Sequence, residues 1–268
     1  MLRTYLVDGD KGGVGKSLTA RALVHYHLTM AADVRPILAV FDADMSNPDV
    51  CGKDGLSLQN SMLETTQILD LSIEQGWIDL SNALDALQTQ HDGEEVRVIV
   101  NMTAQIGSRA FQGAVPIVGE VLRQANAFPI WLLSRVEDAI RTLEERIKAM
   151  PARFESGLIL RNLFFGEAGK FTRWEHSALR ARLLALQAQE SEAQFRWDEN
   201  CLPEINAGVI DAVDRTPFHV ALGQGRGKPL LAHGQRLTLD AWLRRTHEIF
   251  ARMEQFIEYV PKAAAQEG

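Results

Sequence analysis

The sequence predicts an α/β protein with a doubly wound, mostly parallel β-sheet that carries helices on both faces. Short runs rich in β-branched and aliphatic residues alternate along the 268 residues with longer stretches of helical periodicity. Several short runs are continuously apolar, as in residues 36–41, which indicates strands that are buried on both faces. Helices must then cover both faces of one sheet.

The expected elements follow one another in a regular order. Five strands are expected, at Arg3–Asp8, Arg35–Phe41, Val96–Asn101, Phe128–Ser134 and Gly157–Leu163. Six helices are expected, at Lys16–Ala31, Ile73–Gln90, Ser108–Asn126, Val136–Met150, Thr172–Gln189 and Leu239–Tyr259. Because no repeat or flexible linker divides the chain, we expect a single domain over residues 1–268, with a helical C-terminal part from about residue 214.

Composition excludes several classes of protein. Hydrophobic residues at 46% and charged residues at 24% are typical of a globular chain rather than a disordered one. Cys51 and Cys201 are too few for a disulfide framework and have no metal-ligand spacing. No segment is apolar enough to span a membrane, so we expect a cytoplasmic protein without integral membrane association. The net charge of −7 argues against a broad basic surface for nucleic acid, although a local patch stays open.

A glycine-rich loop stands between the first expected strand and the first expected helix. It reads Asp8-Gly9-Asp10-Lys11-Gly12-Gly13-Val14-Gly15-Lys16-Ser17. Glycines allow positive φ angles, so the backbone N–H groups can turn inward to bind a phosphate, and the following helix N-terminus favours the anion. Lys16 can reach the β- and γ-phosphates, and the Ser17 hydroxyl can bind Mg²⁺. The loop therefore predicts a nucleoside triphosphate site.

The run from Lys11 to Ser17 resembles the deviant Walker motif of the ParA/MinD family of P-loop ATPases. The resemblance implies ATP and Mg²⁺ as cofactors. It implies nucleotide contacts from the residues Gly12, Gly13, Val14, Gly15, Lys16, Ser17 and Leu18. It also implies an ATP-dependent homodimer in which Lys11 touches the phosphates bound by the partner. Asp10 stands where the usual motif begins with glycine, and the sequence leaves open how its charge is accommodated near a triphosphate.

Two carboxylates, Asp42 and Asp44, follow the second expected strand. Strand ends of a parallel sheet meet at one edge, so both acids should lie near the phosphate loop. They resemble switch I of the family, which implies that Asp44 positions the attacking water and that Asp42 contacts Mg²⁺ through water. The third strand ends in Asn101 where the family has an aspartate. Because an amide brings no charge to the metal, we expect slow hydrolysis. Gly107-Ser108 is expected to sense the γ-phosphate.

Recognition of the base is expected at the far side of the same edge. Asn162 ends a strand at the place where relatives have an asparagine that reads adenine, and the segment around Pro203 resembles the backbone that packs against that base. The resemblance covers residues 1 to about 213, and its finer features favour the plasmid-encoded StbB/TraL-like subgroup.

The predicted function is an ATP-dependent dimerisation switch that acts in plasmid partition, stability or conjugative transfer. Lys11, Lys16 and Asp44 are its predicted catalytic residues, and hydrolysis should be slow and stimulated by a partner. The resemblance implies a plasmid-encoded partner protein and non-specific DNA as partners. The candidate DNA contacts are Arg236, Arg244, Arg245 and Arg252.

Two alternatives stay open. One is a metabolic P-loop kinase or a synthetase of the dethiobiotin synthetase type, which would need a small acceptor for turnover. The other is a scaffold that binds ATP with little hydrolysis, as Asn101 suggests.

Overall fold

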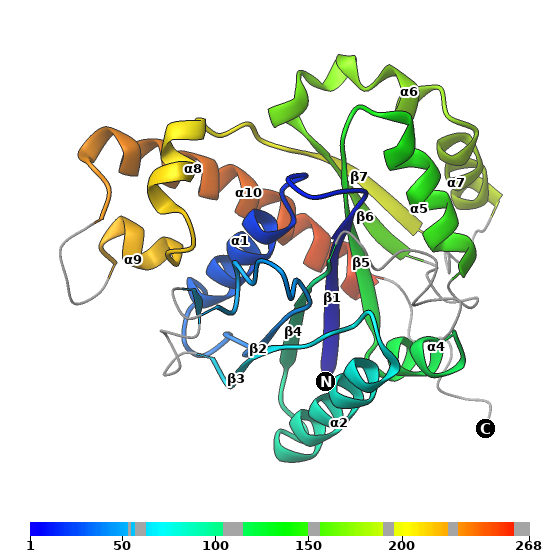
Figure 1. Ribbon diagram of the computed structural model, residues 1–268, viewed down its shortest axis with the longest axis horizontal. Helices are drawn as coiled ribbons and strands as arrows, with labels where there is room; N and C mark the ends of the chain where they lie inside the picture. Colours follow the sequence, from blue (N-terminus) through cyan, green and yellow to red (C-terminus); the bar gives the residue numbers. More distant parts are fainter. Residues whose placement is uncertain are drawn as a thin grey trace.

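In the part of the chain that the computed structural model describes, seven strands form one sheet (Figure 1). The structure describes residues 1–52, 55–56, 63–103, 115–149, 156–189, 196–224 and 230–259. The strands are β1 (Leu2–Gly9), β2 (Ile37–Asp42), β3 (Thr65–Ile68), β4 (Val96–Asn101), β5 (Ala127–Leu133), β6 (Ser156–Asn162) and β7 (Arg196–Leu202). Their order is β3-β2-β4-β1-β5-β6-β7, and every neighbouring pair is parallel. The predicted doubly wound parallel sheet is confirmed.

Helices cover both faces of this sheet. They are α1 (Lys16–Leu28), α2 (Glu74–Gln90), α4 (Val115–Gln124), α5 (Glu137–Ala149), α6 (Thr172–Glu175), α7 (Ala178–Gln189), α8 (Ala207–Val213), α9 (Phe218–Leu222) and α10 (His233–Tyr259). Two short 3₁₀ turns, η2 (Leu163–Phe165) and η3 (Ala168–Lys170), follow β6.

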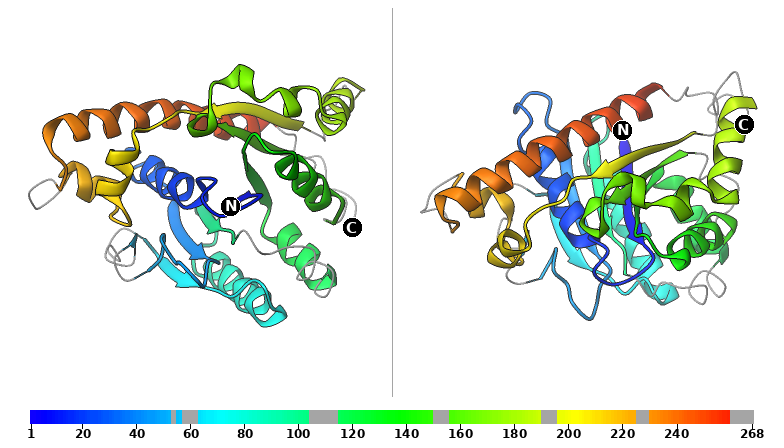
Figure 2. Two further views of the ribbon diagram at one scale, coloured as in Figure 1. Left: turned by 45° about the horizontal axis from the view of Figure 1, so that its top comes forward. Right: turned by 90° about the horizontal axis from the view of Figure 1, so that it is seen from above.

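The pleat of the strands explains how the two faces are divided. On β1, Tyr5 and Val7 pack into a core with α1, α9 and α10, whereas Leu6 packs into a second core with α2 and α4. A third core joins α5, α6 and α7 to β5, β6 and β7. Figure 2 shows α10 lying along one side of the sheet and α2 on the other. The alternation of side chains along each strand produces this layering.

The switch point of the sheet places the candidate site. β1 lies between β4 and β5: strands β2 to β4 are added on one side of β1, and strands β5 to β7 are added on the other side. In open α/β sheets the crevice beyond the carboxyl ends of such strands is where ligands bind. The glycine-rich loop follows β1 directly. Residues 101–103 stand at the end of the neighbouring strand β4, and residues 162–164 stand at the end of β6, one strand beyond β5, at the same edge.

Three expectations about the elements need correction, and a fourth lies partly outside the described residues. β3 and β7 were not expected, because both are edge strands whose polar side chains hide a strand pattern. The helix expected at Thr172–Gln189 is two helices, α6 and α7, separated at His176 and Ser177. The C-terminal helix begins at His233 rather than Leu239. The first half of the helix expected at Ser108–Asn126 lies outside the described residues. None of the described helices is long and apolar enough to cross a membrane.

Candidate nucleotide-binding site

The glycine-rich loop joins β1 to α1 at the carboxyl edge of the sheet. Gly13 and Gly15 have φ angles of 74° and 103°, which residues with a Cβ rarely adopt. A Cβ at Gly15 would also lie 2.8 Å from Nδ2 of Asn162, whereas Gly12 and Gly13 face open space. The loop therefore presents bare backbone and the N-terminus of a 13-residue helix to a cavity, an arrangement that favours an anion.

Lys16 is buried within this loop. Its ammonium group donates a 3.0 Å hydrogen bond to the carbonyl oxygen of Lys11, and the residue is 7% exposed. Burial lowers the pKa of Lys16, while the nearby carboxylates Asp8, Asp44 and Asp10 raise it. A cation that has lost most of its water gains strongly from an anionic ligand. Lys16 thus fits the predicted phosphate contact.

The acids of the loop are engaged on the side away from the cavity. Asp8 accepts a 2.7 Å hydrogen bond from the backbone N–H of Gly9 and forms a 3.0 Å ion pair with Arg146 of α5. Asp10 accepts a 3.3 Å hydrogen bond from the Ser134 hydroxyl after β5. Burial raises the pKa of Asp10, and Lys11 is the largest opposing charge. Asp10 therefore directs Oδ2 toward the end of β5, while its Oδ1 is buried without a hydrogen-bond partner among the described residues.

Lys11 is exposed, unlike Lys16. Its ammonium nitrogen lies 5.6 Å from the centre of the Phe165 ring, within the range of a cation–π contact. The two lysines of this loop therefore lie in different environments. Lys16 lies where we expect the phosphates to bind, and Lys11 lies at the molecular surface.

Asp42 and Asn101 form a buried polar pair where β2 and β4 end. Nδ2 of Asn101 donates to Oδ1 of Asp42 at 2.8 Å and to Oγ of Ser17 at 3.4 Å. Asp42 also accepts hydrogen bonds from the backbone N–H groups of Asp44, Val50 and Cys51. Burial raises the pKa of Asp42, and the hydrogen bonds, first that from Asn101, lower it.

The remaining oxygen of this pair is free to accept. Oδ1 of Asn101 is buried and receives no hydrogen bond from any described residue. It lies on the same amide as the group that donates to Ser17, so a metal-bound water beside the Ser17 hydroxyl would satisfy it. Within the described ranges no three His, Cys, Asp or Glu side chains converge on one point. The two predicted metal residues differ in access: Ser17 lines the cavity, whereas each oxygen of the buried Asp42 carboxylate already accepts two hydrogen bonds. Asp42 would therefore act on a Mg²⁺ at Ser17 through water rather than by direct contact.

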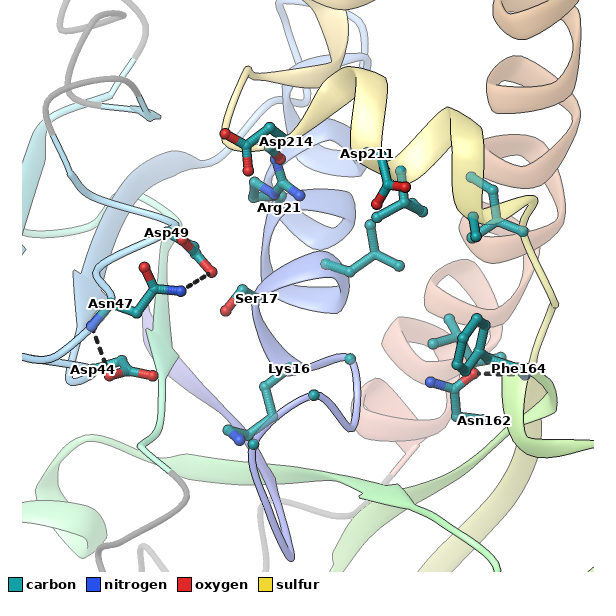
Figure 3. Close-up of a pocket in the computed structure, with 18 of the residues that line it drawn as sticks. Lys16, Ser17, Arg21, Asp44, Asn47, Asp49, Asn162, Phe164, Asp211 and Asp214 are labelled. Carbon is teal, nitrogen blue, oxygen red and sulfur yellow. Dashed lines mark hydrogen bonds between the residues drawn. The ribbon is translucent and has the colours of Figure 1, made fainter.

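Asp44 lies on the loop after β2, half-buried and facing the cavity (Figure 3). Its Oδ1 accepts hydrogen bonds from the backbone N–H groups of Ser46 at 3.2 Å and Asn47 at 3.1 Å. The loop thus curls around this carboxylate and holds it in place.

The cavity has a volume of about 660 Å³, within the usual range for small-molecule sites. Phosphate-loop residues form its floor, and the loop after β2 forms one wall (Figure 3). The far side is mostly apolar and is formed by Leu18, Phe164, Leu202, Pro203, Ile205 and Ile210. Phe164 is 56% exposed, so an aromatic face is available for stacking on a base.

The two residues predicted to recognise adenine lie at the cavity, with part of their polar groups already engaged. Nδ2 of Asn162 donates to the carbonyl oxygen of Val14 at 2.8 Å, and its Oδ1 accepts from the backbone N–H of Phe164 at 3.0 Å. The carbonyl oxygen of Pro203 accepts a 2.8 Å hydrogen bond from Nε1 of Trp242. Asn162 therefore also ties the phosphate loop to the end of β6.

The structure brings nine of the predicted site residues to one cavity: Gly12, Gly13, Gly15, Lys16, Ser17, Leu18, Asp44, Asn162 and Pro203. Lys11, Val14 and Asp42 lie next to it without lining it. Val14 is buried in the core, and Asp42 lies behind the Asn101 amide. Gly107 and Ser108, expected to form switch II, lie outside the described residues.

Sequence reasoning missed the remaining charged lining of the cavity. The acids Asp49, Asp211 and Asp214, together with Arg21, line it as well. A weak indication that Arg21 lines the cavity was present in the sequence, since this residue lies one helical turn after Ser17. Asp214 has a positive φ of 39°, which no local sequence pattern predicts.

A curated relative identifies the family. MobD of Acidithiobacillus ferrooxidans is 30% identical over 182 residues, which cover 66% of this chain and 70% of MobD. The chain belongs to the MobD family. No protein-family model matches the sequence of this MobD-family chain.

Solved structures resemble the MobD-family chain at low identity. MinD from Aquifex aeolicus is 13% identical with a TM-score of 0.49, covering 91% of this chain and 96% of MinD. The pNOB8 ParA protein, solved bound to nonspecific DNA, is 13% identical with a TM-score of 0.48, covering 95% and 99%. Chloroplast FtsY from Physcomitrella patens is 9% identical with a TM-score of 0.39, and the match spans 60% of this chain and half of FtsY. The predicted P-loop fold is confirmed by the parallel sheet and the glycine-rich loop between β1 and α1.

Proposed function

We propose that this MobD-family chain is an ATP-dependent dimerisation switch that binds ATP with Mg²⁺ and hydrolyses it slowly. The observation that carries the proposal is the contrast between two lysines of one loop. Lys16 is buried against the cavity, whereas Lys11 is exposed and its ammonium lies over the Phe165 ring. An exposed cation on the phosphate loop is accessible to the phosphates of a second subunit, which is the role that the resemblance to the deviant Walker motif implies for Lys11.

Each residue of the cavity has a part in this proposal. Backbone N–H groups of residues 12–18 and the ammonium of Lys16 bind the phosphates, and Phe164, Asn162 and the Pro203 segment hold the base. Mg²⁺, when bound at Ser17 with Asp42 acting through water, would screen the phosphate charge. Asp44 holds the attacking water by accepting its hydrogen bond, because its carboxylate faces the cavity and is fixed by two backbone N–H groups.

Slow hydrolysis follows from the neutral end of β4. Asn101 donates to Asp42 and so leaves the metal position with one carboxylate nearby rather than two. Less negative charge near Mg²⁺ weakens its binding and its orientation. The rival candidate, an ATP-binding scaffold with little hydrolysis, rests on the same residue, and the rate of hydrolysis decides between them.

Relationship to MobD favours a plasmid-related cargo over metabolism. We propose that the chain forms one domain, acts in plasmid partition, stability or transfer, and meets a plasmid-encoded partner protein. Direct DNA contact would use α10, where Arg244, Arg245 and Arg252 are exposed. Arg244 pairs with Asp240 at 3.1 Å, but with 71% of its side chain exposed this pair gives way easily to a phosphate.

The test is light scattering of the purified chain with ATP and with ADP, run beside a hydrolysis assay. Wild type should dimerise with ATP and return to monomer as ATP is consumed. Asp44→Ala should keep ATP and stay dimeric, since water positioning fails while the phosphate contacts remain. Lys11→Ala should bind ATP as a monomer. If wild type and Asp44→Ala stay monomeric in ATP, the switch is refuted, and turnover that requires a small acceptor would favour a kinase or synthetase.

A further inference from the structure

A connection between distant parts of the chain lies on the wall of the cavity. The loop after β2 carries Asp44, and the corner between α8 and α9 spans residues 214–217. Arg215 of this α8–α9 corner donates a 2.6 Å hydrogen bond from Nη2 to Oδ1 of Asn47. Its Nε lies 2.9 Å from Oδ1 of Asp49. One guanidinium therefore holds two loop residues that lie more than 160 positions earlier in the chain.

The contact continues to the carboxylate that we expect to hold water. Nδ2 of Asn47 donates to Asp49 at 2.8 Å, and the backbone N–H of Asn47 donates to Oδ1 of Asp44 at 3.1 Å. Figure 3 shows both hydrogen bonds along one wall of the cavity. A shift of Asn47 would therefore move the group that orients the Asp44 carboxylate.

The α8–α9 corner is itself held firmly. Arg21 of α1 is 5% exposed and donates hydrogen bonds to the carbonyl oxygens of Asp214 and Thr216, the latter at 3.3 Å. Its guanidinium also lies 5.1 Å from the centre of the Phe218 ring. Because Arg21 lies on α1, which begins at the phosphate loop, the anchor of Arg215 is fixed to the helix that follows this loop.

We propose that Arg215 is a positioning residue for ATP hydrolysis, which holds the Asp44 carboxylate toward the cavity by clamping Asn47 and Asp49 to the α8–α9 corner. This inference rests on the proposed function, in which Asp44 orients the attacking water. The ion pair is partly exposed, with 37% of the Arg215 side chain and 28% of the Asp49 side chain accessible. Pairs of this kind contribute little to stability, whereas small misplacements of a catalytic group cost much in rate. The clamp should therefore affect hydrolysis far more than folding.

The experiment measures single-turnover hydrolysis, ATP affinity and thermal stability in Arg215→Ala, Arg215→Lys and the control Arg180→Ala. Arg180 is similarly half-buried and contacts Glu199 through Nε at 2.8 Å and 3.1 Å, away from the cavity. Arg215→Ala should lower the hydrolysis rate about tenfold and change ATP affinity less than twofold. Arg215→Lys should recover part of the rate, since lysine can pair with Asp49 but lacks the fork that also reaches Asn47. Arg180→Ala should behave as wild type.

A double-mutant cycle with Asp49→Ala completes the test. The two substitutions break one clamp, so the rate of the double variant should match that of either single variant. Additive losses, an unchanged rate in Arg215→Ala, or a rate loss matched by equal losses of affinity and stability would overturn the proposal. A wild-type chain that binds ATP without hydrolysing it would refute the proposed function instead, and the positioning role would fall with it.

Discussion

Two buried polar clusters lie at opposite ends of the same sheet, and they differ in what surrounds them. The carboxyl-end cluster consists of Asp42, Asn101 and Ser17 beside the large cavity. The amino-end cluster consists of Tyr5, His27, Arg97 and Glu254, which join β1, α1, β4 and α10.

Groups of the amino-end cluster are directed toward one another. The Tyr5 hydroxyl donates to Oε1 of Glu254 at 2.5 Å, and His27 and Arg97 lie 3.5 Å and 3.6 Å from the same carboxylate. Burial raises the pKa of Tyr5 well above its usual value, and the Glu254 carboxylate adds to that shift. A smaller cavity of about 290 Å³ adjoins the cluster.

Both clusters keep buried polar atoms that have no hydrogen-bond partner among the described residues: Oδ1 of Asn101 at the carboxyl end, and both ring nitrogens of His27 with Nε and Nη1 of Arg97 at the amino end. The two ends differ in what surrounds these atoms, because Asn101 lies beside the Ser17 hydroxyl and a glycine-lined floor. At the amino end, a single carboxylate gathers a hydroxyl, an imidazole and a guanidinium from three elements and fixes α10 to the sheet. The first cluster should respond to nucleotide and metal, and the second to substitution and pH.

The largest effect is expected at Glu254. Glu254→Ala leaves the buried Tyr5 hydroxyl without its acceptor and removes the carboxylate beside His27, whereas Arg97 keeps its 2.9 Å pair with Glu95. The free energy of unfolding should fall by about 3 kcal/mol. Urea denaturation measures the loss. Glu248→Ala, an exposed site on the same helix, is the control and should change stability by less than about 0.5 kcal/mol. Equal losses in the two variants would mean that the cluster does not fix α10.

Lys16 tests the opposite cluster. Lys16→Ala removes the buried cation of the phosphate loop, so ATP affinity should fall about 100-fold or more, roughly 3 kcal/mol. Thermal stability should stay unchanged or rise, because burial of this charge opposes folding. Titration calorimetry measures the affinity, with exposed Lys170→Ala as the control. If Lys16→Ala bound ATP with wild-type affinity, the assignment of the phosphate site to this loop would be wrong.

The pH dependence of stability should report on His27. Burial lowers the pKa of His27 to about 3, and Arg97 and His247 add to the shift. The unfolded chain then binds the proton more tightly, so stability is present above the unfolded pKa of 6.5 and is lost as pH falls toward 3. Between pH 7 and pH 5 this loss amounts to about 2 kcal/mol.

His27→Gln should remove that share of the loss, because glutamine cannot be protonated in this range. Urea midpoints at pH 7 and pH 5 compare the variant with wild type. A variant that loses as much stability as wild type over this interval would show that His27 does not titrate on unfolding.

The smallest effect is expected at Asn101. Asn101→Asp should raise single-turnover hydrolysis about tenfold at saturating Mg²⁺, since a carboxylate orients metal-bound water better than an amide. Without metal the new carboxylate would face Asp42 in place of a 2.8 Å hydrogen bond, so the variant should be less stable than wild type. Added Mg²⁺ should restore the melting temperature. A flat or lower rate would mean that the site works only with a neutral residue there.

Local signals in the sequence determined the phosphate loop and the inner strands. Glycines that need positive φ, a lysine and a serine stand in consecutive positions, and the inner strands are apolar runs whose bounds match to within two residues. The loop and five of the seven strands could therefore be predicted. β3 and β7 could not, because an edge strand gains its identity from pairing with a neighbour on one side.

Only the tertiary structure decided how the polar groups are used. No local pattern predicts that Asp10 contacts Ser134, which lies 124 positions later in the chain. Nor does a local pattern predict that Asn47 contacts Arg215, which lies 168 positions later. Likewise, nothing in the sequence distinguishes Glu254 from the other acids of this amphipathic helix, although its carboxylate is the centre of a buried cluster. Short-range chemistry fixes which residues can bind a phosphate, because the loop and helix start lie in consecutive positions. Which charges meet in the interior depends on how helices pack across the sheet, and that packing is set by the whole chain at once.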